Sequence, residues 1–138
     1  MIEQMTPYGF GIRLPLPYDE AVARTKAELA REGFGVLAEI DVSATLEAKL
    51  GVDFPPYVIL GACNPPLAHR ALTAERELGL LLPCNVVVRA GDAEGTSVVS
   101  AMDPEAALAL TENPQVAEVA REVKARLTRV LARLEESD

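Results

Sequence analysis

Two cysteine–asparagine pairs contain the side chains of this sequence that are best suited to chemistry. Cys63 and Asn64 open the run CNPPLAH, whose last residue, His69, is the one histidine of the chain. Cys84 and Asn85 form the second pair, inside the apolar run LLLPCNVVV. A thiolate is a nucleophile and a metal ligand, and a helix N-terminus lowers the pKa of a nearby thiol. With His69 as a base or ligand, these residues are compatible with a thiol- or metal-dependent enzyme or a redox sensor.

Each of these features also has a structural interpretation. Asn64 followed by Pro65 is typical of a helix start, because asparagine caps free backbone N–H groups and proline fits the first helical position. Free cysteines are among the most buried residues of proteins, so both thiols are also compatible with simple core packing. Two cysteines match no zinc signature, which needs further ligands at closer spacing, and we therefore expect no metal site.

Three more polar residues are candidates for a binding site. Glu39 and Asp41 are separated by strand spacing and point to the same side, as an acid–base pair or as a solvated strand end. Tyr57 follows two prolines and either lines a groove or packs in the core. The sequence contains no G-x-S-x-G, G-x-G-x-x-G or phosphate-loop pattern, so it identifies neither a catalytic residue nor a cofactor. The candidate ligand-binding residues are Cys63, Asn64, Cys84, Asn85, Asp41 and Tyr57.

Composition excludes several classes of partner. The 138 residues are sufficient for one core, so we expect a single globular domain over residues 1–138. A net charge of −8 argues against nucleic acid, because phosphate binding relies on clustered Lys and Arg. No run approaches the ~18 apolar residues of a membrane span, and the N-terminal residues do not resemble a signal peptide. Two cysteines form no secreted disulfide framework, so we expect reduced thiols and a cytoplasmic location.

The hydrophobic pattern predicts strands alternating with helices. Five strands are expected at residues 8–14, 34–40, 57–63, 80–89 and 96–102, with a hairpin turn at 91–95. Helices are expected at residues 19–32, 44–50, 65–78 and 114–135, and Gly33 and Gly51 end the first two. The last helix has a continuous apolar stripe that should pack against the sheet. Its members are Val116, Val119, Ala120, Val123, Leu127, Val130, Leu131 and Leu134.

These elements predict an α+β fold in which a mostly antiparallel five-stranded sheet is backed by helices. The strands at 57–63 and 80–89 can be joined as a parallel crossover or as an antiparallel pair with an inserted helix. The hairpin that follows favours the antiparallel case. We therefore predict that Cys63, Asn64, Cys84 and Asn85 gather at one end of the sheet, beside the start of the helix at 65–78.

Four blocks of sequence resemble one known family. They are EID followed by ATLEAKLG (39–51), PPYVILGACNPPLA (55–68), LLPCNVVV (81–88) and MDP (102–104). Together they resemble the uncharacterised bacterial and archaeal family called domain of unknown function 302, over nearly the whole chain. The resemblance implies a β-α-β-β-β-β-α order with short helical insertions, similar to the TATA-binding-protein fold, and it implies a homodimer. It implies no activity, substrate or cofactor.

Three functions follow as expectations. The first is a non-catalytic module that holds a small molecule between sheet and helices, and the second is a homodimer formed through an apolar face, such as that of the last helix. The third is a thiol- or metal-dependent enzyme or redox sensor that uses Cys63, Cys84 and His69. Neither nucleic acid nor a membrane is expected as a partner.

Overall fold

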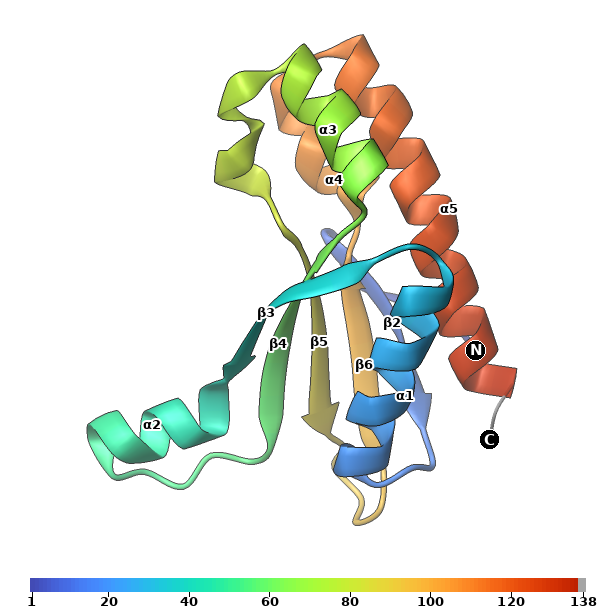
Figure 1. Cartoon of the computed structure of the whole chain (residues 1–138). Helices are drawn as coiled ribbons and strands as arrows, with labels where there is room; N and C mark the ends of the chain where they lie inside the picture. Colours follow the sequence, from blue (N-terminus) through green and yellow to red (C-terminus); the bar gives the residue numbers. More distant parts are fainter. Residues whose placement is uncertain (137–138) are drawn as a thin grey trace.

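A computed structural model describes residues 1–136, which form an antiparallel sheet with helices packed against it (Figure 1). The strands are β1 (Glu3–Thr6), β2 (Gly9–Leu14), β3 (Gly35–Asp41), β4 (Tyr57–Cys63), β5 (Cys84–Ala90) and β6 (Ser97–Met102). The α-helices are α1 (Tyr18–Arg31), α2 (Val42–Leu50), α3 (Pro65–Ala74), α4 (Pro104–Leu108) and α5 (Pro114–Glu136). The 3-10 helices η1 (Arg76–Leu81) and η2 (Ala109–Thr111) follow α3 and α4.

The sheet confirms the expected fold class and corrects the strand count. All neighbouring strands are antiparallel in the order β1-β2-β6-β5-β4-β3, which gives six strands within residues 1–136 instead of five. The unexpected strand is β1, whose sequence EQMT has no apolar alternation to reveal it. It exists because a tight turn folds it back onto β2, so β1 and β3 are the two edge strands.

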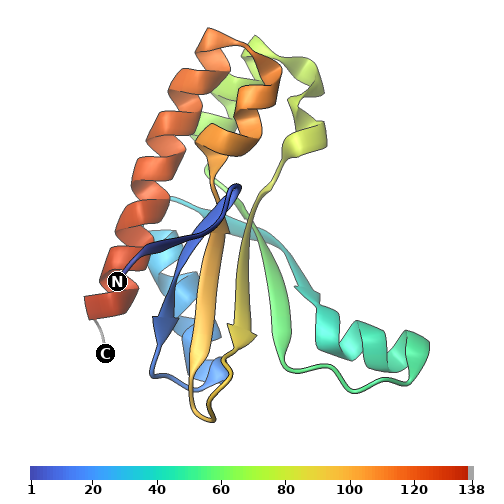
Figure 2. The same cartoon turned by 180° about the vertical axis from the view of Figure 1, so that it is seen from behind.

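Helices cover only one face of the sheet. Alternate side chains of β2, β4, β5 and β6 point to this face and are fully buried under α1 and α5, including Ile12, Leu60, Val86, Val88 and Val99. Figure 2 shows the opposite face, over which no helix of residues 1–136 lies. We call this opposite side the bare face. None of the helices in the described part of the chain is long and apolar enough to cross a membrane.

Helix α5 fulfils the strongest expectation from the sequence. All eight residues of its predicted apolar stripe are buried in the structure. Each buried aliphatic side chain contributes about 1.5–3 kcal/mol relative to exposure. The stripe packs against the sheet and the neighbouring helices within the same chain, so it is not available as the apolar face of a dimer.

The segment between α3 and β5 differs from the prediction. The helix expected at 65–78 ends at Ala74, because Glu75 adopts an extended conformation, and η1 follows with Leu78 buried. The strand expected at 80–89 begins only at Cys84, directly after Pro83, which has no N–H to donate to a sheet. Burial of Leu78 anchors this segment over the end of the sheet.

The segment between β3 and β4 projects from the body of the molecule (Figure 1). We call residues 42–56 the arm; it consists of α2 and the loop that leads into β4. Helix α2 begins at its cap Asp41 and ends at Gly51 with φ 65°, and it has no buried residue. Leu50, Val52 and Phe54 are exposed, so the arm displays apolar side chains to solvent.

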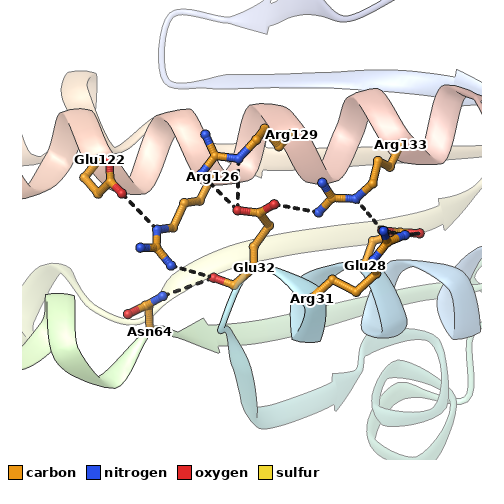
Figure 3. Close-up of polar contacts among 8 residues, drawn as sticks. All are labelled: Glu28, Arg31, Glu32, Asn64, Glu122, Arg126, Arg129 and Arg133. Atoms are coloured by element: carbon orange, nitrogen blue, oxygen red, sulfur yellow. Dashed lines mark hydrogen bonds and ion pairs between the residues drawn. The ribbon is translucent and has the colours of Figure 1, made fainter.

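Glu32 joins three helices through its main chain and its side chain (Figure 3). Helix α1 ends in a Schellman motif, in which Phe34 N–H donates to Leu29 and Gly33, with φ 83°, donates to Ala30. The freed carbonyl oxygen of Glu32 accepts from Asn64 Nδ2 at 3.2 Å and from Arg126 Nη1 at 3.0 Å.

The Glu32 carboxylate accepts from Arg129 Nε at 3.0 Å and from Arg133 Nη2 at 2.8 Å, and Arg133 also binds Glu28 (Figure 3). The hydrogen bond from Arg129, with that from Arg133, lowers the pKa of Glu32 below 4.5 although partial burial opposes this. Since the folded pKa lies below the unfolded value, this stabilisation is present above pH 4.5 and is lost as pH falls through the lowered pKa.

We predict that Glu32→Gln lowers the free energy of unfolding by about 1–2 kcal/mol at pH 7, because two arginine contacts lose their charged acceptor. The difference from wild type should shrink as pH falls below 4.5. Urea denaturation across this pH range measures both effects. Glu20→Gln, which removes an exposed pair with Arg24 on the same helix, is the control and should change stability by less than about 0.5 kcal/mol. Equal losses in the two variants would contradict the role given to Glu32.

Candidate binding pocket

A pocket of about 390 Å³ lies where β4 ends and β5 begins. Helix α3 and η1 stand over this end of the sheet beside α4 and α5, as Figure 1 shows. Residues of β3, β4 and β5 line the pocket from one side, and residues of α3, η1, α4 and α5 line it from the other. The volume is at the small end of the range of about 300–1,000 Å³ found for ligand sites.

The inner wall of the pocket is mostly apolar. No charged residue within residues 1–136 lines it, and besides the two thiols the only polar side chain in the lining is that of Asn64. Such a wall offers an ionised ligand no partner, and burying an unpaired charge is costly. The wall therefore suits an uncharged, apolar molecule. Its buried members are Phe34, Ala62, Asn64, Leu67, Ala71, Cys84, Leu108, Val119 and Val123.

The mouth of the pocket is bordered by exposed residues. Leu37 and Ala38 come from edge strand β3, Leu72 from α3, Gly79 from η1, and Pro83 precedes β5. Leu37 is 71% exposed although it lines the pocket, because the pairing of β3 with β4 shifts between Val36 and Ala38. Apolar surface thus continues from the pocket out to the edge of the sheet.

Asn64 makes hydrogen bonds to the protein through both ends of its amide. Its Oδ1 accepts from Leu67 N–H at 3.4 Å, which confirms the predicted helix cap, and its Nδ2 donates to Glu32 (Figure 3). The residue is buried, with both ends of its amide in use. Asn64 therefore fixes the start of α3 against the end of α1 and holds this wall of the pocket in place.

The antiparallel arrangement brings the two cysteines together, as predicted. Cys84 pairs with Ala62, and antiparallel partners have Cα atoms about 4.5–5.5 Å apart, so Cys63 lies one residue from that pair. Alternation directs the two thiols to opposite faces, and both line the pocket because it lies at the end of the two strands. Both cysteines are free.

Burial raises the pKa of the Cys84 thiol to about 11, with the neighbouring Cys63 as a smaller cause. Cys84 is therefore protonated at neutral pH and is a poor nucleophile. Cys63 is only partly buried and is the more accessible thiol of the pair.

The other predicted residues lie outside the pocket. Asn85 pairs with Gly61 at the same end of the sheet but is exposed on the bare face. Asp41 and Tyr57 lie at the opposite end, since Asp41 pairs with Val58 whereas Gly35 pairs with Cys63.

Asp41 has a structural role. It caps α2, accepting from Ala44 N–H at 2.9 Å and from Ser43 Oγ at 2.8 Å, and the Ala44 bond followed by the Ser43 bond lowers its pKa. Glu39 forms an ion pair with Lys26 of α1 at 2.7 Å. Asp41 and Glu39 are thus used in structural contacts and do not bind the cysteine pair.

His69 does not join the cysteines. It is exposed on α3 and borders a separate shallow hollow with Thr73, Gln115 and Glu118. The described residues contain no group of three or more His, Cys, Asp or Glu side chains placed to hold a metal ion. The geometry thus provides no cysteine–histidine pair for nucleophilic catalysis.

Much of the pocket was not identified from the sequence. Leu67, Ala71, Val119 and Val123 read as ordinary core positions of their helices, and Gly79 as the link between the helix expected at 65–78 and the strand expected at 80–89. The one available signal was the break between α3 and β5, where Gly79 and Pro83 interrupt an apolar run. Which helix faces meet over the end of the sheet is a matter of tertiary packing.

Comparison with known proteins supports a family assignment. The family model described as "Domain of unknown function DUF302" matches residues 10–134. The crystal structure of an uncharacterized conserved protein DUF302 from Bacillus stearothermophilus is similar, with 32% sequence identity and a TM-score of 0.84. The similarity covers 92% of this chain and 98% of that chain. No curated protein matches the sequence. The chain therefore belongs to the DUF302 family, as its sequence blocks suggested.

Proposed function

We propose that this chain is a non-catalytic module that binds an uncharged, largely aliphatic small molecule in the pocket at the end of the sheet. The observation that carries the proposal is the composition of the lining, which is apolar and, within the described residues, without charge. Asn64 is the one amide side chain in the lining, and it already accepts from Leu67 N–H and donates to the Glu32 carbonyl, so it serves first to hold the pocket wall together. Apolar burial must therefore supply most of the affinity.

The expected affinity is modest. A ligand that buries about 250 Å² of apolar surface gains roughly 6 kcal/mol from that burial. The loss of translational and rotational freedom on binding offsets part of this gain, so we expect a dissociation constant no tighter than about 10 μM. An uncharged fluorescent probe such as N-phenyl-1-naphthylamine, whose emission rises in apolar surroundings, is suited to detecting such a site.

We predict that wild-type protein binds N-phenyl-1-naphthylamine and that Gly79→Phe weakens binding at least tenfold. A Cβ at Gly79 meets no atom within 4 Å, and Gly79 borders the pocket, so the new ring has room to occupy its mouth. Fluorescence titration measures the dissociation constants, and thermal denaturation checks that the variant folds.

Leu80→Phe is the matched control, because Leu80 lies on the same turn, is exposed and does not line the pocket. It should bind the probe as wild type does. Equal binding by wild type and Gly79→Phe, or no binding by wild type, would contradict the proposal.

A second proposal is that two copies of the chain form a homodimer through the arm and the bare face. The specific observation is an apolar stripe across three strands of the bare face. Ile40 pairs with Ile59, and Ile59 pairs with Val87, so alternation places all three side chains on one side. We call Ile40, Ile59 and Val87 the bare-face stripe.

The arm supports a second copy as the partner. Helix α2 is short and has no buried residue, and an isolated helix of this length is marginal in water. The arm continues directly from β3, the strand that contributes Ile40 to the stripe, and its residues Leu50, Val52 and Phe54 are exposed and apolar. A two-fold arrangement lets the arm of each copy cover the stripe of the other, so both apolar surfaces are buried in one symmetric contact.

We predict that Ile40→Lys shifts the protein from dimer to monomer, since it places a charge in the centre of this contact. Ile40 is 49% exposed, so the fold of each chain should survive. Leu110→Lys is the control, because Leu110 is exposed on η2, away from the arm and the stripe. Sedimentation equilibrium measures the association constants. A wild-type monomer at 100 μM, or a dimer equally strong in Ile40→Lys, would refute this proposal.

The alternative of a thiol-dependent activity makes a different prediction about reactivity. If the cysteines serve only as pocket lining, an alkylating reagent at pH 7 should modify Cys63 and leave Cys84 protected, because Cys84 is buried and its pKa is raised to about 11. Intact-protein mass spectrometry of wild type, Cys63→Ser and Cys84→Ser distinguishes the two sites. Rapid modification of Cys84 in the folded protein would favour thiol chemistry.

We also infer a cytoplasmic location for the protein. Both cysteines of the chain are free, and two cysteines do not provide the disulfide framework on which small secreted domains rely. The partly buried Cys63 is compatible with a reducing environment, where it stays free for contact with a ligand.

A further inference from the structure

We propose that self-association closes the mouth of the pocket, so that ligand binding and dimerisation strengthen each other. This inference rests on both parts of the proposed function, a pocket that binds an apolar molecule and a second copy seated on the bare face. It adds that the two events are coupled through edge strand β3.

The mouth of the pocket opens beside the bare face. A Cβ built on Gly61 would lie 2.9 Å from Pro83 Cγ and 3.3 Å from Ala38 Cβ. Pro83 and Ala38 therefore both lie close to the side of β4 to which a side chain at Gly61 would point. Because Gly61 and Ile59 have the same parity on β4, this side of β4 is on the bare face.

The rim of the mouth is continuous with the bare-face stripe. Ala38 pairs with Gly61, and Ile40 pairs with Ile59, so Ala38 and Ile40 are neighbours on one side of β3. A second copy that covers Ile40 and Ile59 must lie next to Ala38 and Pro83. Apolar surface at the mouth that is exposed to solvent in the monomer is then covered by the second copy in the dimer.

Strand β3 is the element that the two sites share. It is an edge strand whose one neighbouring strand in the described residues is β4, and the shift in pairing before Ala38 leaves Leu37 out of the regular ladder. A ligand in contact with Leu37 and Ala38 holds this part of β3 in place. The same strand carries Ile40 and leads through Asp41 into the arm, so its ordering also favours association.

Thermodynamic linkage makes the coupling reciprocal. If dimerisation tightens ligand binding by some factor, the ligand must tighten dimerisation through the same cycle. Coupling between sites is typically about 5–150-fold. We therefore expect N-phenyl-1-naphthylamine at saturation to lower the dimer dissociation constant at least about fivefold.

The test combines two titrations of the full chain. Sedimentation equilibrium gives the dimer dissociation constant with and without saturating N-phenyl-1-naphthylamine. Fluorescence titration gives the probe dissociation constant at protein concentrations below and above the dimer dissociation constant. For wild type, the dimer dissociation constant should be lower in the presence of the probe. The probe dissociation constant should be lower at protein concentrations at which the dimer predominates.

Two variants separate the contributions. Ile40→Lys should remain a monomer and bind the probe with the weaker affinity of the wild-type monomer at every protein concentration. The dimerisation of Gly79→Phe should no longer respond to the probe. Leu110→Lys, as the control, should show the wild-type coupling.

Each failure has a distinct signature. If the probe binds but the dimer dissociation constant does not change, the coupling is wrong while ligand binding stands. If the probe binds and wild type stays a monomer even at saturation, both the coupling and the homodimer are wrong. If the probe does not bind at any concentration, the ligand-binding function itself is wrong, and this inference falls with it.

Discussion

The junction at Glu32 is the contact on which the pocket and its surroundings depend. The Schellman motif ends α1 and turns the Glu32 carbonyl outward, where Asn64 and Arg126 both donate to it. Its carboxylate binds Arg129 and Arg133 of α5. One residue thus fixes the end of α1, the start of α3 and the position of α5. Because Asn64 is also the cap of α3, the helix wall of the pocket has a defined place over the end of the sheet.

One-sided coverage of the sheet explains the remaining features. The helices bury the face that contains Leu60, Val86 and Val99, and the other face keeps an apolar stripe with no helix over it in the described chain. The arm projects from the β3 edge of the sheet without a buried residue of its own. Pocket, stripe and arm all meet at β3, so the same edge strand supports ligand binding and association in the proposed function.

Local sequence signals predicted most of the elements, because these signals act over a few residues. The cap and proline at 64–65, the glycine at 33 with positive φ, and the stripe of α5 all have the structure expected of them. The antiparallel pairing that brings Cys63 near Cys84 was also predicted, from the hairpin after β5. Of the pocket lining, the predicted site residues include only Cys63, Asn64 and Cys84, because the lining combines residues from seven separate elements. Asp41 and Tyr57 have side chains suited to ligand binding, but they lie where β3 ends and β4 begins, at the far end of the sheet from the pocket.

The central claim is that an uncharged apolar molecule sits between the end of the sheet and α3. Nuclear Overhauser effects between bound N-phenyl-1-naphthylamine and assigned methyl groups test it most directly, because they locate the ligand without any substitution. We expect contacts from the probe to methyl groups of Leu67, Ala71 and Val123, which line the inner wall. Contacts confined to Leu50 and Val52 of the arm, with none to the inner wall, would contradict it.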